Sequence, residues 1–201
     1  MGSSSAIPLS LFQYELPEEL VAQVPVEPAD ASRLMHICRE SGFAGHRAFL
    51  DLPDILRAGD LIVVNRTRVI PARLSAIRPT GGKVELLFNR PLNGSVVDAT
   101  QWSVMGRPGK ALRPGATLLV GDTKLDVLAR EGMFARIGSK GPLWPLLEAK
   151  GQLPLPPYIR RPEGPVTSDA TQYQSLFAKE LGAVAAPTAS LASSSAPLLG
   201  V

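Results

Sequence analysis

Six short segments with strand-like composition follow one another between residues 69 and 138, and no helix-like stretch separates them. Glycine, proline, asparagine and aspartate turns divide these segments. Short strands that are joined by tight turns pair with their neighbours, and a sheet that closes on itself has no exposed edge. The sequence therefore predicts a small antiparallel β-barrel over about Val69 to Gly138. The segments are VIPARLSAI, KVELLFNRP, QWSVMGRP, ATLLVGD, KLDVLAR and MFARIG.

The residues before the barrel predict the first part of an α/β body. Prolines bound residues 16–25, which favour a short helix. Two apolar-rich runs on either side of Glu40-Ser41-Gly42 predict a hairpin. The continuous apolar run LIVVN, Leu61 to Asn65, is typical of a strand that is buried on both faces.

The residues after the barrel predict the return of the chain to this body. A helix is expected over residues 142–151 and another over residues 168–182, each ending at a glycine. The fold class is thus an α+β or α/β body with an inserted antiparallel barrel. The expected parts are 11–66, the barrel at 67–140, the return at 141–189, and an unmatched tail, 190–201, that we expect to be disordered.

Composition narrows the class of protein. Apolar residues make up 45% of the 201 and charged residues 19%, which is typical of a globular chain. Cys38 is the only cysteine, and no apolar run reaches the roughly 20 residues of a membrane helix. His36 and His46 lie ten residues apart without neighbouring ligands, so no metal site is expected. We expect a cytoplasmic protein.

Charge is unevenly spread along the chain. Leu11 to Asp60 carries nine acidic and four basic residues, whereas Asn65 to Arg113 carries nine basic and two acidic residues. Clustered Lys and Arg attract phosphates, so the barrel is the candidate surface for a polyanion. An ordinary solvated surface is the alternative.

Two groups of polar residues mark the entry to the barrel. Asn65, Thr67, Arg68 and Arg73 surround the crossing from the LIVVN segment, where side chains can reach a ligand; a plain polar hinge is the alternative. Lys83 and Glu85 are two residues apart and so share one face of a strand. Such a pair can serve as acid and base, or can be a surface salt bridge.

The proline-rich stretch LPLPPYIRR holds Tyr158 and Arg160 in a backbone that proline fixes in advance. The tyrosine suits a base and the arginine a phosphate, unless the stretch is only a rigid linker. Further on, GAVAAPTA packs small residues into a tight loop, in which Thr188 could donate a hydroxyl or cap a helix.

In order and spacing, the chain resembles the S-adenosylmethionine:tRNA ribosyltransferase-isomerase family of queuosine biosynthesis. The resemblance covers about Leu11 to Ala189, which corresponds to the first half of a full-length family member. It departs from the family at Pro28-Ala29-Asp30, where an arginine is usual, and after Ala189 the family pattern does not continue. The matching stretches are LPEELVAQVP, DASRLM, LRAGDLIVVNRTRVIPARL, GGKVELLF, GQLPLPPYIRRP and YQSLFAKELGAVAAPTA.

The resemblance implies a fold and a reaction. The fold is an α/β body with an inserted β-barrel. The reaction moves the ribosyl unit of S-adenosylmethionine, the co-substrate, onto 7-aminomethyl-7-deazaguanine at the tRNA wobble position. The product is epoxyqueuosine, and adenine and methionine are released. The partner is the anticodon stem-loop of the precursor tRNA, and no metal is implied.

The resemblance marks motif positions without assigning their roles, and the needs of the reaction suggest the roles that we expect. Glu85 is the candidate base or sulfonium partner, with Lys83 beside it. We expect a truncated and inactive form of the enzyme; a non-catalytic RNA-binding barrel and a structural or regulatory partner are the alternatives. The expected substrate and tRNA contacts are Asn65, Thr67, Arg68, Arg73, Tyr158, Arg160, Tyr173 and Thr188.

Overall fold

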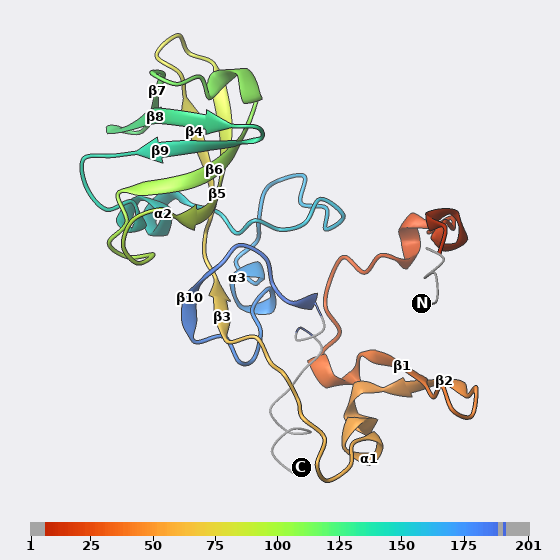
Figure 1. Cartoon of the computed structure of the whole chain (residues 1–201). Coiled ribbons are helices and arrows are strands. Elements are labelled where there is room, and N and C mark those ends of the chain that lie inside the picture. Colours follow the sequence, from red (N-terminus) through yellow and green to blue (C-terminus); the bar gives the residue numbers. More distant parts are fainter. Residues whose placement is uncertain (1–6, 189–190, 192–201) are drawn as a thin grey trace, which may run out of the picture.

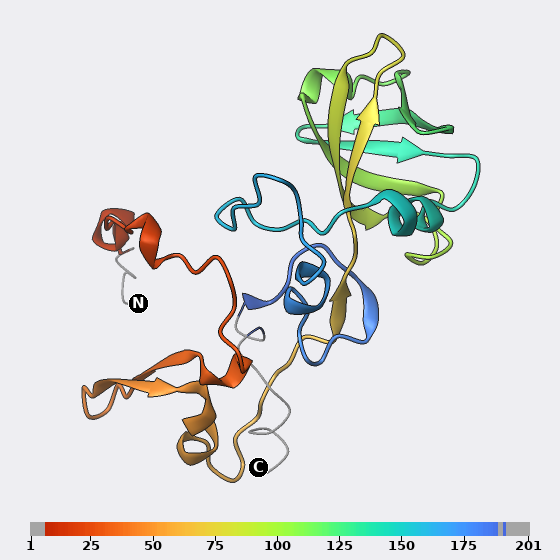
Figure 2. The same ribbon diagram turned by 180° about the vertical axis from the view of Figure 1, so that it is seen from behind.

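The computed structural model describes residues 7–188 and 191. Three parts follow one another in space (Figure 1): an N-terminal region with a hairpin, a small central unit and a β-barrel at one end. The view from behind shows the same arrangement (Figure 2). Apart from Leu191, the predicted tail 190–201 lies outside the described residues. Within the described part, no helix is long and apolar enough to cross a membrane.

Six antiparallel strands close into the predicted barrel. They hydrogen-bond in the order β4-β5-β6-β9-β8-β7, and β4 meets β7 where Ile77 lies opposite Leu119. The barrel predicted from the sequence is therefore confirmed. Its strands are β4 (Arg73–Ile77), β5 (Lys83–Pro91), β6 (Gln101–Arg107), β7 (Thr117–Val120), β8 (Thr123–Glu131) and β9 (Phe134–Gly138).

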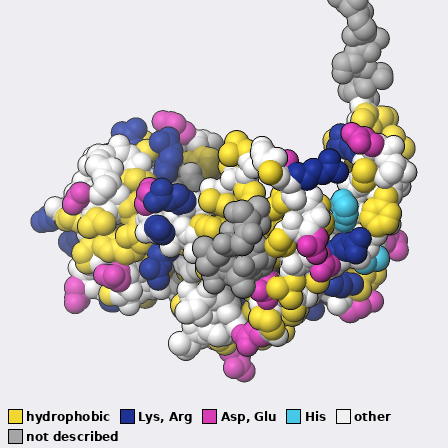
Figure 3. Space-filling model, turned by 90° about the horizontal axis from the view of Figure 1, so that it is seen from below, with side chains coloured by type: hydrophobic (Ala, Val, Ile, Leu, Met, Phe, Trp, Pro, Cys, Tyr) yellow, Lys and Arg dark blue, Asp and Glu magenta, His cyan; other side chains and the backbone are white. Residues whose placement is uncertain are grey.

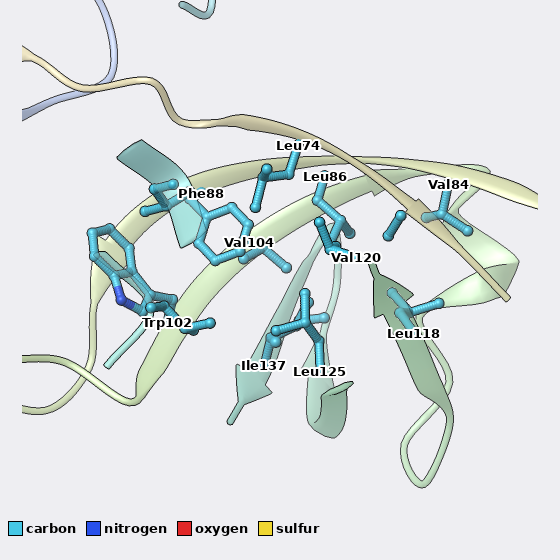
Figure 4. Packing of buried hydrophobic residues seen from close by; sticks show 14 of the residues in the cluster. Leu74, Val84, Leu86, Phe88, Trp102, Val104, Leu118, Val120, Leu125 and Ile137 are labelled. Atoms are coloured by element: carbon cyan, nitrogen blue, oxygen red, sulfur yellow. The ribbon is translucent and has the colours of Figure 1, made fainter. Parts of the chain in front are cut away.

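Alternate side chains of each barrel strand fill the barrel interior. On β5, Val84, Leu86 and Phe88 are buried and point into the barrel (Figure 4), while Glu85 and Leu87 between them are less buried. Phe88 and Trp102 meet edge to face with ring centroids 5.7 Å apart. Burying one such side chain contributes about 1.5–3 kcal/mol, so this core is the main source of stability.

Helix α2 (Trp144–Lys150) covers the end of the barrel nearer the central unit (Figure 1). Leu143 and Leu147 belong to the barrel's core cluster. The chain then returns to β4, because Gln152 and Arg73 exchange backbone hydrogen bonds of 3.0 and 2.8 Å. The helix predicted at 142–151 is confirmed. A single turn, η5 (Gly109–Ala111), lies at the opposite end (Figure 1).

The central unit contains the parallel strands β3 (Thr67–Val69) and β10 (Glu180–Ala183) and the short helix α3 (Asp169–Gln172). The prediction of one helix over residues 168–182 is wrong, because α3 ends at Gln172. Beyond it, Gly182 lies at a bulge in β10. Its φ of +147° is a backbone conformation that residues other than glycine rarely adopt.

The N-terminal region consists of single turns and one hairpin. Strands β1 (Arg33–Ile37) and β2 (Ala44–Ala48) form the predicted hairpin. The helix predicted at 16–25 is wrong, because only the 3-10 turn η2 forms and none of its residues is buried. A segment this short without a packed face does not repay helix nucleation. The turns are η1 (Leu9–Phe12), η2 (Glu18–Leu20), η3 (Ala29–Ala31), η4 (Phe49–Asp51) and α1 (Leu52–Ile55).

The LIVVN segment is neither a strand nor buried, which contradicts the prediction. Leu61 and Val63 are 87% and 86% exposed, and Ile62 and Val64 are 43% and 38% exposed. The alternation is that of an extended chain, but no strand among the described residues pairs with it. An apolar run therefore lies open to solvent just before β3.

Candidate functional site

A cavity of about 380 Å³ lies between residues 21–26, the proline-rich loop 155–161 and helix α3. Its volume falls in the range of about 300–1,000 Å³ that is usual for ligand sites. Most of its wall is apolar, and Tyr158, Tyr173 and Thr188, three of the predicted contacts, meet there. The lining residues are Val21, Ala22, Gln23, Val24, Pro25, Val26, Ser32, Leu155, Tyr158, Ile159, Arg161, Asp169, Gln172, Tyr173, Thr188 and Leu191.

A buried ion pair forms part of the cavity wall. Arg161 donates from Nε and Nη2 to the two carboxylate oxygens of Asp169 at 3.0 and 2.8 Å, and Asp169 is only 4% exposed. Asp169 also accepts the Val166 backbone N–H at 2.9 Å. The guanidinium holds the pKa of Asp169 below its usual value and that carboxylate raises the pKa of Arg161, although burial opposes both effects. The pair is therefore charged at neutral pH.

Gln23 fastens the N-terminal segment to the proline-rich loop. Its amide nitrogen donates to the Tyr158 carbonyl at 2.9 Å, and its amide oxygen accepts the Arg160 N–H at 2.7 Å. Arg161 donates in turn to the Gln23 carbonyl at 3.2 Å. The cavity thus depends on contacts between residues about 135 positions apart in the sequence.

The two tyrosines of the cavity differ in environment. Tyr173 is 6% exposed, and burial raises the pKa of its phenol while a hydrogen bond with the Ala186 backbone opposes that rise. The phenol is therefore neutral at pH 7. Tyr158 is 52% exposed, so its ring is free to meet a ligand. The predicted Arg160 does not line the cavity, and its guanidinium pairs with Glu18.

The predicted pair on the barrel lies outside the cavity. Lys83 and Glu85 point outward on β5, with Val84 and Leu86 buried between and beside them, as the alternation predicts. The ion pair of Glu85 is with Arg73, whose Nη1 lies 4.0 Å from the carboxylate. Arg73 also donates to the Leu155 carbonyl at 3.2 Å. Arg73 thereby connects Glu85 to a residue of the cavity wall.

The remaining predicted residues gather around β3. The side-chain oxygen of Asn65 accepts hydrogen bonds from the Thr67 N–H at 2.7 Å and the Thr67 hydroxyl at 2.5 Å. This Asx turn starts the strand, which gives Asn65 and Thr67 a structural role. Arg68 lines a different cavity of about 680 Å³, together with Gln152, Gln174 and Lys179 among others.

Sequence reasoning missed Gln23, Arg161 and Asp169. Arg161 stands beside the predicted Arg160, and Asp169 reads as a helix cap, so neither residue type signals the pairing. Over residues 7–188 and 191, no three His, Cys, Asp or Glu side chains lie close enough together to hold a metal ion.

Comparison with known proteins identifies the family. The family model described as queuosine biosynthesis protein matches residues 9–198. The chain belongs to the queuosine biosynthesis protein family. An S-adenosylmethionine:tRNA ribosyltransferase-isomerase of Anaeromyxobacter sp. (strain Fw109-5) is 51% identical over 187 residues, and one of Aquifex aeolicus is 44% identical over 184 residues.

These relatives of the queuosine family are longer than this chain. The match covers 91% of the chain and 53% of the Anaeromyxobacter protein, and 90% and 52% for the Aquifex protein. The chain thus spans about half the length of the curated relatives it matches. A crystal structure of an S-adenosylmethionine tRNA ribosyltransferase from Thermotoga maritima is 34% identical with a TM-score of 0.35, covering 76% of this chain and 51% of that one.

Proposed function

We propose that this chain supplies the S-adenosylmethionine-binding part of a tRNA ribosyltransferase-isomerase. The reaction transfers the ribosyl unit of S-adenosylmethionine to 7-aminomethyl-7-deazaguanine at the tRNA wobble position, gives epoxyqueuosine and releases adenine and methionine. Family membership and relatives of up to 51% identity that carry this name support the proposal. They favour an enzyme over a non-catalytic RNA-binding module.

The cavity between the N-terminal segment and the proline-rich loop is our proposed co-substrate site. Its apolar wall suits the nucleoside, and the exposed face of Tyr158 can stack on a base or attract a sulfonium. Thr188 offers a hydroxyl at the same wall. Arg161 and Asp169 neutralise each other, so the wall presents no net charge to the adenine.

The chemistry needs a general base beside the sulfonium, and Glu85 is our proposed base or sulfonium partner. Arg73 connects its carboxylate to the cavity wall, and Lys83 follows on the same face of β5. A base acts only within hydrogen-bond reach of the proton that it removes, so the ribosyl unit must extend from the cavity past Leu155 toward Glu85. Arg68 and Arg160 are proposed contacts to the phosphates of the anticodon stem-loop.

Calorimetric titration of the full chain with S-adenosylmethionine tests this function. Tyr158→Ala removes the exposed ring at the cavity and is expected to weaken binding about tenfold, the effect of losing one stacked group of about 1–3 kcal/mol. Tyr14→Ala is the matched control, because Tyr14 is 79% exposed and lies outside the cavity. Binding that is absent, or equal in the parent and Tyr158→Ala, contradicts the proposed site.

Turnover separates the enzyme from the alternatives. We expect this chain alone, as a truncated and inactive form, to release no adenine or methionine even with tRNA that carries the aminomethyl precursor. Release at the rate of a full-length relative would contradict that expectation. A chain that binds this tRNA but never S-adenosylmethionine would instead be an RNA-binding module.

A further inference from the structure

Three cations line a hollow at one end of the barrel. That end of the barrel points away from β3 and β10 (Figures 1 and 2). Arg78, Lys110 and Arg113 line this hollow, whose volume is about 500 Å³ and which lies between the β4–β5 turn, η5 and β7. None of its lining residues is acidic. The others are Pro79, Thr80, Ala111, Ala116, Thr117 and Leu118.

The backbone fixes Arg78 at this hollow. Its N–H donates to the Gly82 carbonyl, and its carbonyl accepts the Gly81 N–H, both at 2.8 Å, which closes the β4–β5 turn. Its guanidinium lies over Gly82, in the space that a Cβ at that position would occupy. Glycine at position 82 therefore leaves room for this side chain.

The positive charge of the hollow is not neutralised by the ion pairs of the described chain. None of the four ion pairs among the described residues involves Arg78, Lys110 or Arg113. Buried Nε of Arg78 has no hydrogen-bond partner within the described part. An N–H that loses water without gaining a partner is destabilising, so an anion that draws the guanidinium into the hollow would supply the missing acceptor.

The carboxylate opposite Thr117, a residue that lines the hollow, already accepts a hydrogen bond. Asp126 on β8 accepts the hydroxyl hydrogen of Thr117 at 2.9 Å, across the β7–β8 pair. Lys110 and Arg113 are exposed, so both can turn toward a ligand.

Distance decides which ligand suits the hollow. Arg73, whose side chain bonds Leu155 of the first cavity, and Arg78 at the hollow are five residues apart through β4, which at about 3.3 Å each is roughly 17 Å. A small substrate that fills the tyrosine cavity, which is the cavity lined by Tyr158 and Tyr173, does not also reach the hollow. A folded RNA can, because its phosphates repeat along a backbone that extends beyond any single binding pocket.

We propose that Arg78, Lys110 and Arg113 form a second binding site, which takes backbone phosphates of the same tRNA at a distance from the modified base. The proposal rests on the proposed function, because it needs tRNA as the substrate. Arginine and lysine grip phosphate oxygens without reading bases, so the site contributes affinity and orientation rather than sequence choice.

Fluorescence anisotropy of the full chain with labelled tRNA at several salt concentrations tests this site. Each neutralised phosphate contributes about 0.7–0.9 to the slope of log K against log salt. The triple variant R78A/K110A/R113A is therefore expected to lose about two to three units of slope and to bind about tenfold or more weakly at low salt. The matched control is R39A/R47A/R57A, three exposed arginines of the N-terminal region, and it is expected to bind like the parent.

Arg78 packs on the β4–β5 turn, so its replacement could disturb folding. A second variant that keeps Arg78 therefore separates lost binding from lost folding. K110A/R113A changes only exposed side chains, and should keep the parent's melting temperature while losing one to two units of slope, about 0.7–0.9 for each contact. A parent-like slope in both variants, an equal loss in the control, or a parent that does not bind RNA overturns the site. S-adenosylmethionine titration of the same variants reports separately on the proposed function, because the tyrosine cavity contains none of these cations.

Discussion

At the scale of single residues, the wall of the tyrosine cavity depends most on the pair of Arg161 and Asp169. Both oxygens of Asp169 are bonded, and the carboxylate is almost fully buried. A buried charge that loses its partner keeps its desolvation penalty without the compensating attraction. Removing one member of the pair therefore lowers the free energy of unfolding by more than the intact pair contributes to it.

Asp169→Asn is expected to destabilise the folded chain by about 1–3 kcal/mol, because the partly buried guanidinium of Arg161 loses its charged hydrogen-bond partner. Urea unfolding at pH 7 measures this loss. Asp98→Asn is the control, since Asp98 is exposed and bonds only to nearby Ser95. A loss at Asp169 no larger than at Asp98 would contradict the role of the pair.

The contribution of Asp169 also depends on pH. Its pKa is lower in the folded chain than the ordinary value of 3.8, so folding is stabilised above pH 3.8. The stabilisation is lost as pH falls below 3.8 through the folded pKa. The difference in the free energy of unfolding between the parent and Asp169→Asn should therefore be at its maximum at pH 6 and become smaller below pH 3.8.

Cys38 offers a second test at this scale. Hydrogen bonds from Ser41, first from its side chain and then from its backbone, lower the pKa of the thiol from 9.0, with smaller contributions from Glu40 and Arg57. Ser41→Ala should raise that pKa and slow alkylation by iodoacetamide at pH 8, because the thiolate is the reactive form. The rate measured against pH should shift to higher pH in Ser41→Ala, and Ser10→Ala, far from the thiol in sequence, should leave it unchanged.

At the scale of elements, the side chain of Gln174 joins α3 to β3. Its amide accepts the Val69 N–H at 2.8 Å and donates to the Val69 carbonyl at 2.9 Å. One side chain thus takes the place of a neighbouring strand at Val69. Both backbone groups of that residue would otherwise need new partners.

Gln174→Leu is expected to cost about 1–3 kcal/mol, because it leaves two backbone groups of β3 without partners. Hydrogen exchange at Val69 should accelerate, while exchange in the barrel strands stays as in the parent. Gln172→Leu is the matched control, since Gln172 bonds only the exposed side chain of Glu27. Unchanged exchange at Val69 would show that Gln174 does not support the strand.

The barrel was predictable from sequence because its signals are local. Alternation along β5 and the turn residues between strands specify which side chains enter the core without reference to distant residues. The helix expected over residues 168–182 failed for the opposite reason. Gln174 bonds Val69, 105 positions away, and β10 pairs with β3, so tertiary contacts override the helical pattern.

The same distinction applies to the candidate site. The proline-rich stretch pointed to Tyr158 and the small residues of GAVAAPTA to Thr188, and the structure brings both to one cavity. Gln23 reaches the loop across about 135 positions, and no single-sequence pattern encodes that contact. Hydropathy alone predicted burial for Leu61 to Asn65, but burial needs a partner surface, and the described chain provides none there.

At the scale of the whole molecule, stability is concentrated in the barrel and the central unit. The buried apolar residues begin at Val69, and the larger cluster lies between Ile70 and Leu147. Residues 7–65 contain many exposed large apolar side chains, and Figure 3 shows apolar side chains spread across the face seen from below Figure 1. Cooperative unfolding of all parts is therefore not expected.

Hydrogen exchange is expected to divide the chain into two stability classes. Amides of the barrel strands should exchange slowest, because they unfold only with the core, whereas residues 61–65 should exchange at once. Leu86→Ala removes a fully buried side chain and should cost about 2–5 kcal/mol, which accelerates exchange throughout the barrel. Leu20→Ala, at a side chain 64% exposed, should change nothing. Uniform protection across the chain would contradict this division.

The open apolar run before β3 predicts self-association of the purified chain. Leu61 and Val63 expose most of their surface, and contact between copies would remove that surface from water at about 25 cal/mol per Å². The double variant L61S/V63S should therefore scatter less light at high concentration and bind less of a hydrophobic dye. I62S/V64S is the matched control in the same segment, because these side chains are 43% and 38% exposed and should contribute less. Equal effects of the two double variants would mean that association depends on the apolar composition of the segment and not on how exposed each side chain is. In an extended chain, Leu61 and Val63 point to one side, which is why this pair is the one tested. If neither double variant changes the scattering or the dye binding, the contacts between copies form elsewhere on the molecule.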